Sequence, residues 1–425
     1  MTLGLFLLAL MVFMCLGMPI AFSLIMTGVV LMWHLDFFDP QLVAQNLISG
    51  ADSFPLMAVP FFVLAGEVMN AGGISRRIIN LAIACVGHRR GGLGFVAIIA
   101  SVILASLSGS AIADTAALAT LLLPMMRDNG YPVGRSSGLI ASGGIIAPII
   151  PPSMPFIIFG VTTNQSISQL FMAGIVPGVI MGVGLVCAWI WSAKQIDVEP
   201  QPRQSMKARL ATAKDGIFAL LMPVIIVGGL RGGVFTPTEA AVVAAAYALV
   251  ISVFVYRELR IKDLLPLFVR AAQTTSIVMF LCAAAIVSSY MVTLADMPQQ
   301  LVELLGPIMD SPRTLMVAIV IAMMLIGMVM DLTPTILILG PVLMPIVIKA
   351  GIDPIYFGVM FVMVGCVGLI TPPIGTVLSV VSGVARQPME VIVKGVMPFL
   401  LVYLVIIALL VAFPSIITWP ASYLY

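Results

Sequence analysis

Two short polar clusters interrupt long apolar stretches of the chain. The first is Ser106-Leu107-Ser108-Gly109-Ser110, with Asp114 one turn further on, and the second is Asp331-Leu332-Thr333-Pro334-Thr335. Hydroxyl, carboxylate and carbonyl oxygens are the ligands that hard cations prefer. Ser, Asp and Thr are also favoured N-cap residues, and Pro suits the first turn of a helix. Each cluster therefore predicts two short helices that meet at a polar tip, where a helix N-terminus attracts an anion.

A pair of adjacent prolines follows each cluster at a similar distance. The two segments are Pro148-Ile149-Ile150-Pro151-Pro152-Ser153 and Thr371-Pro372-Pro373-Ile374-Gly375. Proline lacks a backbone N–H and clashes with the preceding turn, so each pair should break a helix and free carbonyl oxygens. A tip together with a break would supply cation ligands twice, once for each cluster.

Composition indicates where these clusters lie. Of the 425 residues, 61% are hydrophobic and only 9% are charged, and the mean hydropathy is +1.18. A soluble domain needs more charge, so we predict an all-α polytopic membrane protein. The net charge of +2 comes with no basic stripe interleaved with aromatics, so nucleic acid is not expected as a partner. The cysteines lack metal-type spacing and are interpreted as packing residues.

The chain contains an internal repeat. A shift of 221 positions superposes 92–186 on 313–407 without a gap, and the coincidences include glycines and prolines, which determine backbone geometry. Ser110 and Asp331 are equivalent under this shift. Apolar segments of spanning length are predicted at 3–33 (one helix or two, divided at Gly17-Met18-Pro19), 53–71, 136–162, 171–193, 216–232, 238–256, 273–293, 357–383 and 393–413.

Loop charges predict that the two copies are inverted. Connection 71–91 carries four arginines and no acid, whereas connection 294–312 carries Asp296, Glu303 and Asp310 and no lysine, although it ends just before Arg313. By the positive-inside rule the first faces the cytoplasm and the second faces outside. The basic connections 194–215 and 257–270 are also predicted to be cytoplasmic. This scheme puts the N-terminus in the cytoplasm and the C-terminus outside, provided that 92–126 and 314–350 each enter and leave on one side.

These observations give a predicted organisation of inverted repeats, each with a re-entrant helical hairpin and a Pro-Pro-broken helix. The predicted parts are an N-terminal helix region (1–52), a first repeat (53–193) with hairpin 92–126 and broken helix 136–162, a cytoplasmic linker (194–215), a central helix pair (216–262), and a second repeat (263–425) with hairpin 314–350 and broken helix 357–383. Irregular backbone at membrane depth is tolerated only around a protein-lined cavity, and secondary transporters place their sites there.

Other interpretations remain open for these residues. Serine and glycine also allow close helix packing, and prolines also produce simple kinks. Asp331 fits that interpretation poorly, because an ionisable group at membrane depth is costly and usually functional. An intramembrane enzyme with Ser108 or Ser110 as nucleophile would need a nearby base. The only histidines, His34 and His88, lie in predicted loops on opposite sides of the membrane, so no enzyme is predicted.

The segment 231–244 (RGGVFTPTEAAVVA) resembles the large membrane subunit of tripartite ATP-independent periplasmic (TRAP) transporters. Further motifs with this resemblance are 59–66 (VPFFVLAG), 108–115 (SGSAIADT), 331–334 (DLTP) and 371–375 (TPPIG). They occur in order and cover essentially the whole chain.

The resemblance implies an elevator-type importer of the bacterial inner membrane, driven by Na+ as the coupling ion. Its implied partners are a small four-helix membrane subunit, a periplasmic solute-binding protein and a small anion, such as a dicarboxylate, sialic acid, sugar acid or keto acid. Region 1–52 and the pair 216–262 would form a stationary scaffold. A self-sufficient Na+- or H+-coupled carboxylate carrier of similar fold is the alternative.

The same resemblance assigns ligands to the tips and breaks. The implied sodium ligands are Ser106, Ser108, Gly109, Ser110, Asp114, Pro151, Asp331, Thr333, Gly368, Thr371 and Pro372. The implied substrate-binding residues are Ser110, Pro152, Ser153, Thr333, Pro334, Pro373 and Gly375.

Overall fold

The computed structural model describes residues 2–424 except 197, 199, 201, 305 and 307–310, and it omits the side chains of Leu107, Ser108, Leu304, Tyr423 and Leu424. The predictions that involve the Ser108 side chain, Asp310 and positions 197, 199 and 201 of the linker therefore lie outside the described residues. The described part contains helices and no strands. Seven of its helices are long and apolar enough to cross a bilayer, which agrees with a multi-pass membrane protein.

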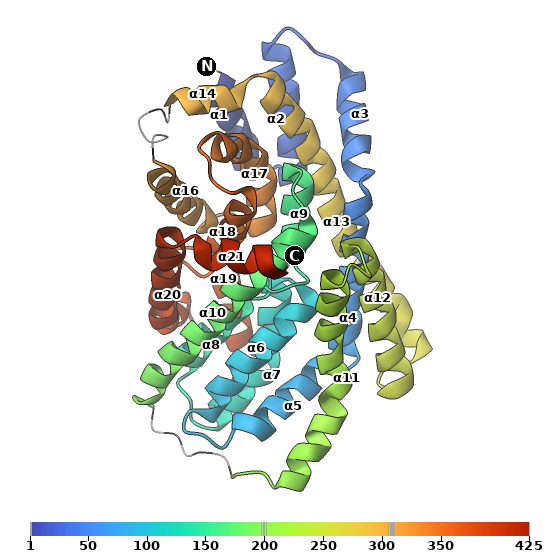
Figure 1. Ribbon diagram of the computed structural model, residues 1–425, viewed down its shortest axis with the longest axis vertical. Coiled ribbons are helices and arrows are strands. Elements are labelled where there is room, and N and C mark those ends of the chain that lie inside the picture. The colour runs from blue at the N-terminus through green and yellow to red at the C-terminus, as the bar shows by residue number, and fades with distance from the viewer. Residues whose placement is uncertain are drawn as a thin grey trace.

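The helices fall into two series that follow the same order (Figure 1). The first series is α1 (Thr2–Cys15), α2 (Ile20–His34), α3 (Pro40–Ala51), the 3-10 turn η1 (Phe54–Met57), α4 (Ala58–Ala71), α5 (Ile74–Val86), α6 (Gly92–Ser108), α7 (Ala111–Asp128), α8 (Val133–Gly144), α9 (Met154–Thr163) and α10 (Ile167–Ala193). The second is α11 (Met206–Arg231), α12 (Pro237–Val250), the π-helical turn η2 (Ile251–Val255), α13 (Ile261–Leu294), α14 (Met297–Leu304), α16 (Pro312–Gly327), α17 (Leu332–Lys349), α18 (Pro354–Gly368), α19 (Thr376–Ala385), α20 (Met389–Ala412) and, beyond the repeat, α21 (Ser415–Leu424).

Helix boundaries extend the internal repeat over nearly the whole chain. The shift of 221 positions carries the bounds of α7 onto those of α17, and it carries the start of α8 onto the start of α18. The shift also carries the start of α3 onto the start of α13. The single long helix α13 therefore corresponds to three consecutive elements of the first series, α3, η1 and α4. Under the same shift the region 1–52 corresponds to 222–273, which the sequence comparison over 92–186 did not include.

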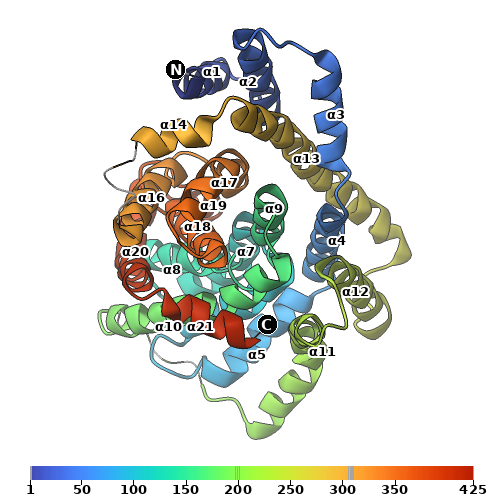
Figure 2. The same cartoon turned by 45° about the horizontal axis from the view of Figure 1, so that its top comes forward.

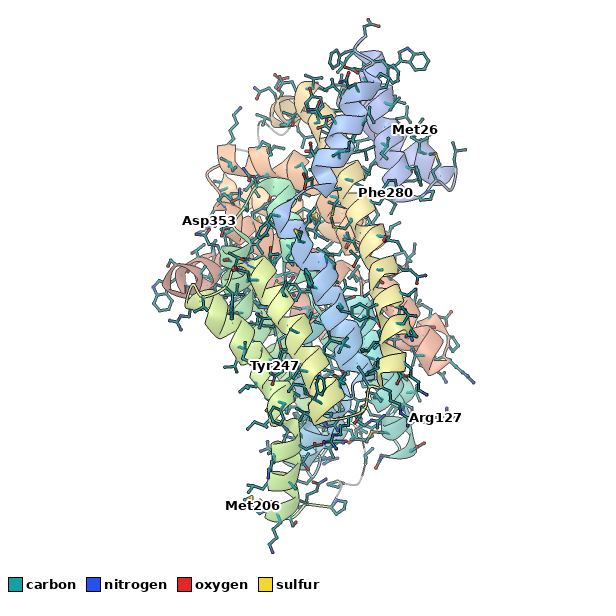
Figure 3. The ribbon with its side chains drawn as sticks, turned by 90° about the vertical axis from the view of Figure 1, so that its right-hand side faces the viewer. Met26, Arg127, Met206, Tyr247, Phe280 and Asp353 are labelled. Atoms are coloured by element: carbon teal, nitrogen blue, oxygen red, sulfur yellow. The ribbon has the colours of Figure 1, made fainter. Side chains whose placement is uncertain are left out.

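Equivalent elements lie at opposite ends of the molecule. Figures 1 and 2 both show α5 at the lower end and its equivalent α14 at the upper end. Figure 3 shows Arg127, near the end of α7, low in the molecule, whereas Asp353, just beyond the end of α17, lies high. This arrangement agrees with the inverted repeats predicted from loop charge.

Segment 3–33, for which one helix or two were both open, forms the two helices α1 and α2. Gly17 adopts a left-handed backbone with φ of 79°, and Pro19 precedes α2, so segment 3–33 turns back as two helices. The N-terminus therefore returns to the end of the molecule that holds α14, where the Gln300 side-chain amide donates to the Thr2 hydroxyl (2.6 Å). The N-terminus thus lies at the opposite end of the molecule from α5 (Figure 1).

Two predicted connections are shorter than expected. Residues 206–215 of the predicted linker belong to α11, because the Ser205 hydroxyl accepts the Ala208 N–H (3.2 Å) and caps the helix. Most of 257–270 belongs to α13, which begins at Ile261. The sequence interpretation also missed α3, α5, α14 and α21, which are 8 to 13 residues long and shorter than a membrane span.

The helices form an outer arc and an inner body. Figure 2 shows the outer arc, α1–α4 and α11–α13, along one side of the inner body, α6–α10 and α16–α20. The two repeats interlock within the inner body, where the Tyr403 hydroxyl of α20 donates to the Ser142 carbonyl of α8 (2.7 Å). Between the arc and the body, Arg77 of α5 pairs with Glu258 (2.6 Å) and Asp215 (3.2 Å) of the arc, so α5 is attached to the outer arc.

Candidate functional site

The predicted hairpins are helix pairs with polar tips. Helices α6 and α7 are joined by Gly109 and Ser110, and α16 and α17 are joined by residues 328–331. Ser110 is the N-cap of α7, and its hydroxyl accepts the Ala113 N–H (3.3 Å). Its equivalent Asp331 is the N-cap residue of α17. The two tips thus present a hydroxyl and a carboxylate at equivalent positions.

Both tips line a single cavity of about 70 Å³. Gly109 and Ser110 contribute from the first hairpin, and Asp331 and Thr333 contribute from the second. Ala111 and Leu332, the first residues of α7 and α17, line the same cavity. The N-termini of two helices and a carboxylate therefore converge on one small volume.

Each tip lies against the Pro-Pro break of its own repeat. A Cβ added to Gly109 would lie 2.7 Å from the Pro152 carbonyl oxygen, so only glycine allows this approach at the first tip. At the second, a Cβ added to Gly368 would lie 2.7 Å from the Cα of Gly327. The Gly375 N–H also donates to the Met328 carbonyl (3.3 Å). The breaks therefore support the tips.

The breaks are irregular segments between short helices. Residues 145–153 separate α8 from α9, and residues 369–375 separate α18 from α19. Ser153 is the N-cap of α9: its hydroxyl accepts the Phe156 N–H (3.3 Å) and donates to the Pro148 carbonyl. The peptide bonds Pro151-Pro152 and Pro372-Pro373 are both cis. Pro148 and Leu369 bring the two breaks to the cavity wall.

The structure brings only part of the predicted ligand set to this cavity. Gly109, Ser110, Asp331 and Thr333 line it. The other assigned residues with described side chains lie outside its lining: Ser106, Asp114, Pro151, Pro152, Ser153, Pro334, Gly368, Thr371, Pro372, Pro373 and Gly375.

The hydroxyls outside the lining are bonded to their own helices. The Ser106 hydroxyl donates to the Ile103 carbonyl (2.6 Å), and the Thr371 hydroxyl donates to the Val367 carbonyl (2.7 Å). Asp114 is buried in the first turn of α7. Sequence spacing located these residues near the tip correctly, but it did not predict which side each would face.

Apolar residues complete the cavity wall and were not predicted. They are Ile112, Met154, Pro155, Ile158, Val278, Leu332 and Leu369. Val278 belongs to α13, so the outer arc closes one side of a cavity that is otherwise lined by the inner body. An apolar residue on an apolar helix has no sequence pattern that separates a cavity wall from ordinary packing.

The available ligands suit a hard monovalent cation and an anion. Among the described residues, no three His, Cys, Asp or Glu side chains gather as a metal group. The cavity offers one carboxylate, two hydroxyls and backbone oxygens, together with the N-termini of two helices. Oxygen ligands with one negative charge fit sodium, whereas the helix N-termini fit a carboxylate.

The two breaks differ in exposure. Pro151, Pro152 and Ser153 of the first break are buried. In the second, Pro373 is exposed, and Ile374 is 46% exposed. Since the breaks are equivalent by sequence, this difference shows that the inner body is covered unequally in this conformation.

Comparisons with known proteins agree with this geometry. The family model described as "Tripartite ATP-independent periplasmic transporter, DctM component" matches residues 7–416. The chain is 55% identical over 408 residues to the 2,3-diketo-L-gulonate TRAP transporter large permease protein YiaN of Escherichia coli, covering 96% of each chain. It is 37% identical to the sialic acid TRAP transporter large permease protein SiaM of Vibrio cholerae, covering 94% of this chain and 93% of that protein.

A solved structure shares the fold. The YdaH transporter of Alcanivorax borkumensis superposes with a TM-score of 0.64 at 14% identity, over 89% of this chain and 88% of that one.

Proposed function

The chain belongs to the DctM component family of tripartite ATP-independent periplasmic transporters, and from this premise we propose that it imports a small organic anion by sodium symport across the bacterial inner membrane. It is a transporter permease rather than an enzyme. The observation that carries the proposal is the single cavity between the two hairpin tips. In that cavity the Asp331 carboxylate lies beside the N-termini of α7 and α17.

Cation and anion support each other in this arrangement. Sodium beside Asp331 would neutralise the carboxylate, which otherwise repels an incoming anion. The N-termini of α7 and α17 would then attract the carboxylate of the solute. Sodium binding would thereby raise the affinity for the solute, and linkage requires the converse.

We further propose that transport moves the inner body past the outer arc as an elevator. The cavity belongs almost entirely to the inner body, with Val278 as its contact with the arc. Helix α5 is ion-paired to the arc through Arg77, so the first moving joint would be the segment 87–91 between α5 and α6. Gly91 adopts φ of 70° there, a conformation that glycine adopts without strain.

The proposed partners are a small four-helix membrane subunit and a periplasmic solute-binding protein. Support comes from the family, whose description is tripartite and periplasmic. The relative that is 55% identical is named for 2,3-diketo-L-gulonate, which is a keto sugar acid. A solute of that chemical class is the first substrate to test.

Uptake in proteoliposomes tests this function. We expect accumulation of 2,3-diketo-L-gulonate only when an inward sodium gradient, the small subunit and the loaded binding protein are all present. Replacing external sodium with choline should reduce initial uptake to background. Uptake that persists in choline would overturn sodium coupling, and uptake without the two partners would instead support a self-sufficient carrier.

The orientation of the chain follows from the same proposal. We place connection 71–91 in the cytoplasm because of its four arginines, and α14 and the N-terminus in the periplasm. The C-terminus is also proposed to be periplasmic, because Ser422 shares a cavity with Gln169. Gln169 ends the connection 163–169, which carries no charged residue and is therefore placed outside by the positive-inside rule.

Thiol labelling checks this orientation. In a cysteine-free background, Glu303→Cys should react with a membrane-impermeant maleimide in intact spheroplasts, whereas Arg89→Cys should react only after permeabilisation. Both residues are exposed, so neither should escape labelling through burial. Labelling of both from the same side would eliminate the inverted arrangement.

A further inference from the structure

A second and larger cavity lies beside the first hairpin and is not part of the site described above. Its volume is about 360 Å³, and its lining comes from the α4–α5 junction, from α7 and from Glu258. The α4–α5 residues include Asn70, Ser75 and Arg76. The cavity thus lies between the outer arc and the inner body, at the end of the molecule that holds α5 (Figure 1).

One face of α7 joins the two cavities. Ala111 and Ile112 line the cavity at the tips, and Ala116, Ala117, Thr120 and Leu121 line the larger one. Positions 112, 116 and 120 recur at four-residue intervals and therefore share one side of the helix. Ile112 is 37% exposed and Thr120 is also exposed. This side of α7 is therefore accessible along its length from the hairpin tip toward α5.

The lining of the larger cavity carries an unpaired positive charge. Arg76 is exposed and forms no ion pair with any residue that the structure describes. Glu258, the acid in the lining, is held by Arg77 at 2.6 Å. Asp215, the other partner of Arg77, is more than half exposed and lies outside the lining. The charge of Glu258 is thus compensated, and that of Arg76 is not.

Asn70 adds an oriented donor next to this charge. The Ser75 hydroxyl donates to the Asn70 side-chain oxygen (2.7 Å), which leaves the Asn70 amide NH2 as the available group. The Thr120 hydroxyl on the opposite wall donates to the Ala116 carbonyl (2.7 Å). A guanidinium with a neighbouring amide NH2 recognises a carboxylate through charge-assisted hydrogen bonds.

We propose that this cavity is a second anion-binding subsite on the cytoplasmic release path, where Arg76 and Asn70 receive the carboxylate of the solute after it leaves the hairpin tips. The inference rests on the proposed function, because it assigns a direction and an anionic solute to that transport. Release through a charged subsite would lower the barrier for an anion that leaves a largely apolar cavity.

Thiol chemistry tests the charge and access of the subsite without any substrate. Thr120→Cys, in a cysteine-free background, is treated from the cytoplasmic side with a sulfonate-bearing or a trimethylammonium-bearing methanethiosulfonate. We expect the cysteine introduced by this substitution to react from the cytoplasmic side. We expect Arg76→Gln to lower the ratio of the reaction rate with the sulfonate reagent to that with the ammonium reagent by about fivefold, since one nearby positive charge is removed. Arg203→Gln is the matched control, because Arg203 is exposed and lies outside both the lining and the proposed joint, and it should leave the ratio unchanged.

A second cysteine position controls for misfolding of the Thr120→Cys variant. Ala117→Cys lines the same cavity and should show the same dependence on Arg76. Reaction only from the periplasmic side, or equal ratios with and without Arg76 at both positions, would overturn the subsite.

Transport measurements test whether the subsite contributes to function. In sodium-driven uptake, Arg76→Gln should lower the maximal rate about tenfold, as expected for loss of a charge-assisted hydrogen bond, while the half-saturating sodium concentration stays unchanged. Arg76→Lys should recover part of the rate, and Arg203→Gln should match the unmodified protein. An unaltered rate in Arg76→Gln would refute the subsite. Failure of the unmodified protein to take up solute with sodium would instead refute the proposed function, whereas the thiol ratios would still report on the cavity.

Discussion

Asp331→Asn is expected to abolish sodium-driven uptake while the protein still folds. Among the residues that the structure describes, Asp331 supplies the one carboxylate in the lining of the hairpin cavity, and asparagine keeps its size while removing the charge. Loss of one partner from a buried charge pair costs about 3–5 kcal/mol, which corresponds to a decrease of at least about a hundredfold in sodium affinity. Initial uptake at a fixed sodium gradient measures this effect, and thermal unfolding in detergent confirms folding.

A second aspartate on the inner body provides the control. Asp353 is the N-cap of α18 and accepts the Tyr356 N–H (2.7 Å), but it does not line the hairpin cavity. Asp353→Asn changes the same charge and keeps a good capping residue, so uptake should remain within about twofold. If Asp331→Asn transported as well as Asp353→Asn, the carboxylate at the second tip would have no part in cation binding.

Raising the sodium concentration distinguishes a weakened site from an absent one. If Asp331 binds the cation directly, Asp331→Asn should regain some uptake when external sodium is raised about a hundredfold, within the osmotic limits of the vesicles. The solute affinity measured at saturating sodium should change much less. A variant whose solute affinity falls while its sodium dependence is preserved would place Asp331 on the anion instead.

Sequence reasoning located the hairpin tips because their residues conflict with their surroundings. Ser110 and Asp331 lie in apolar stretches, where burying a polar group is costly and usually serves a function. Their equivalence under the shift of 221 positions identified both tips. The Pro-Pro breaks were located for a similar reason, since Pro151 and Pro372 cannot continue a helix. The structure places each break against its own tip, as the repeated pattern suggested.

The course of the N-terminal segment could not be decided by the same means. Residues 3–33 are apolar throughout, and hydropathy alone does not distinguish one tilted span from two shorter helices that turn back. The structure has two helices, α1 and α2, with a positive φ at Gly17 in the turn between them. Short helices such as α5 and α14 escaped prediction because they need no spanning length.

The sequence also could not predict which side chains near the tips point into the cavity. Ser106 and Thr371 match the expected ligand types, but each hydroxyl bonds to a carbonyl of its own helix. Serine and threonine commonly satisfy themselves in this way. The cavity wall at Val278 comes from a distant helix, and its position depends on tertiary packing that no local pattern encodes.

Gly368→Ala is expected to disable transport through backbone displacement instead of ligand loss. The added Cβ would lie 2.7 Å from the Cα and 2.8 Å from the carbonyl carbon of Gly327, and neither atom belongs to a flexible side chain. The second tip must then move away from its break, as in other overpacked interiors, where the cost is about 1–3 kcal/mol. Because Asp331 and Thr333 follow Gly327 by four and six residues, this shift should carry the cation ligands out of register and reduce uptake at least about tenfold.

Gly383→Ala is the matched control for this effect. Gly383 lies within α19 of the same repeat, is exposed, and has no heavy atom within 4 Å of an added Cβ. Alanine in a helix interior is favoured over glycine by about 0.5–1 kcal/mol, so Gly383→Ala should keep full uptake and unfold at the same or a slightly higher temperature. Uptake and the unfolding temperature, measured for both variants, separate the two cases. Equal behaviour of the two variants would show that the Gly327–Gly368 contact does not hold the second tip in place, because the same change in side chain would then have the same consequence at a crowded and at an open position.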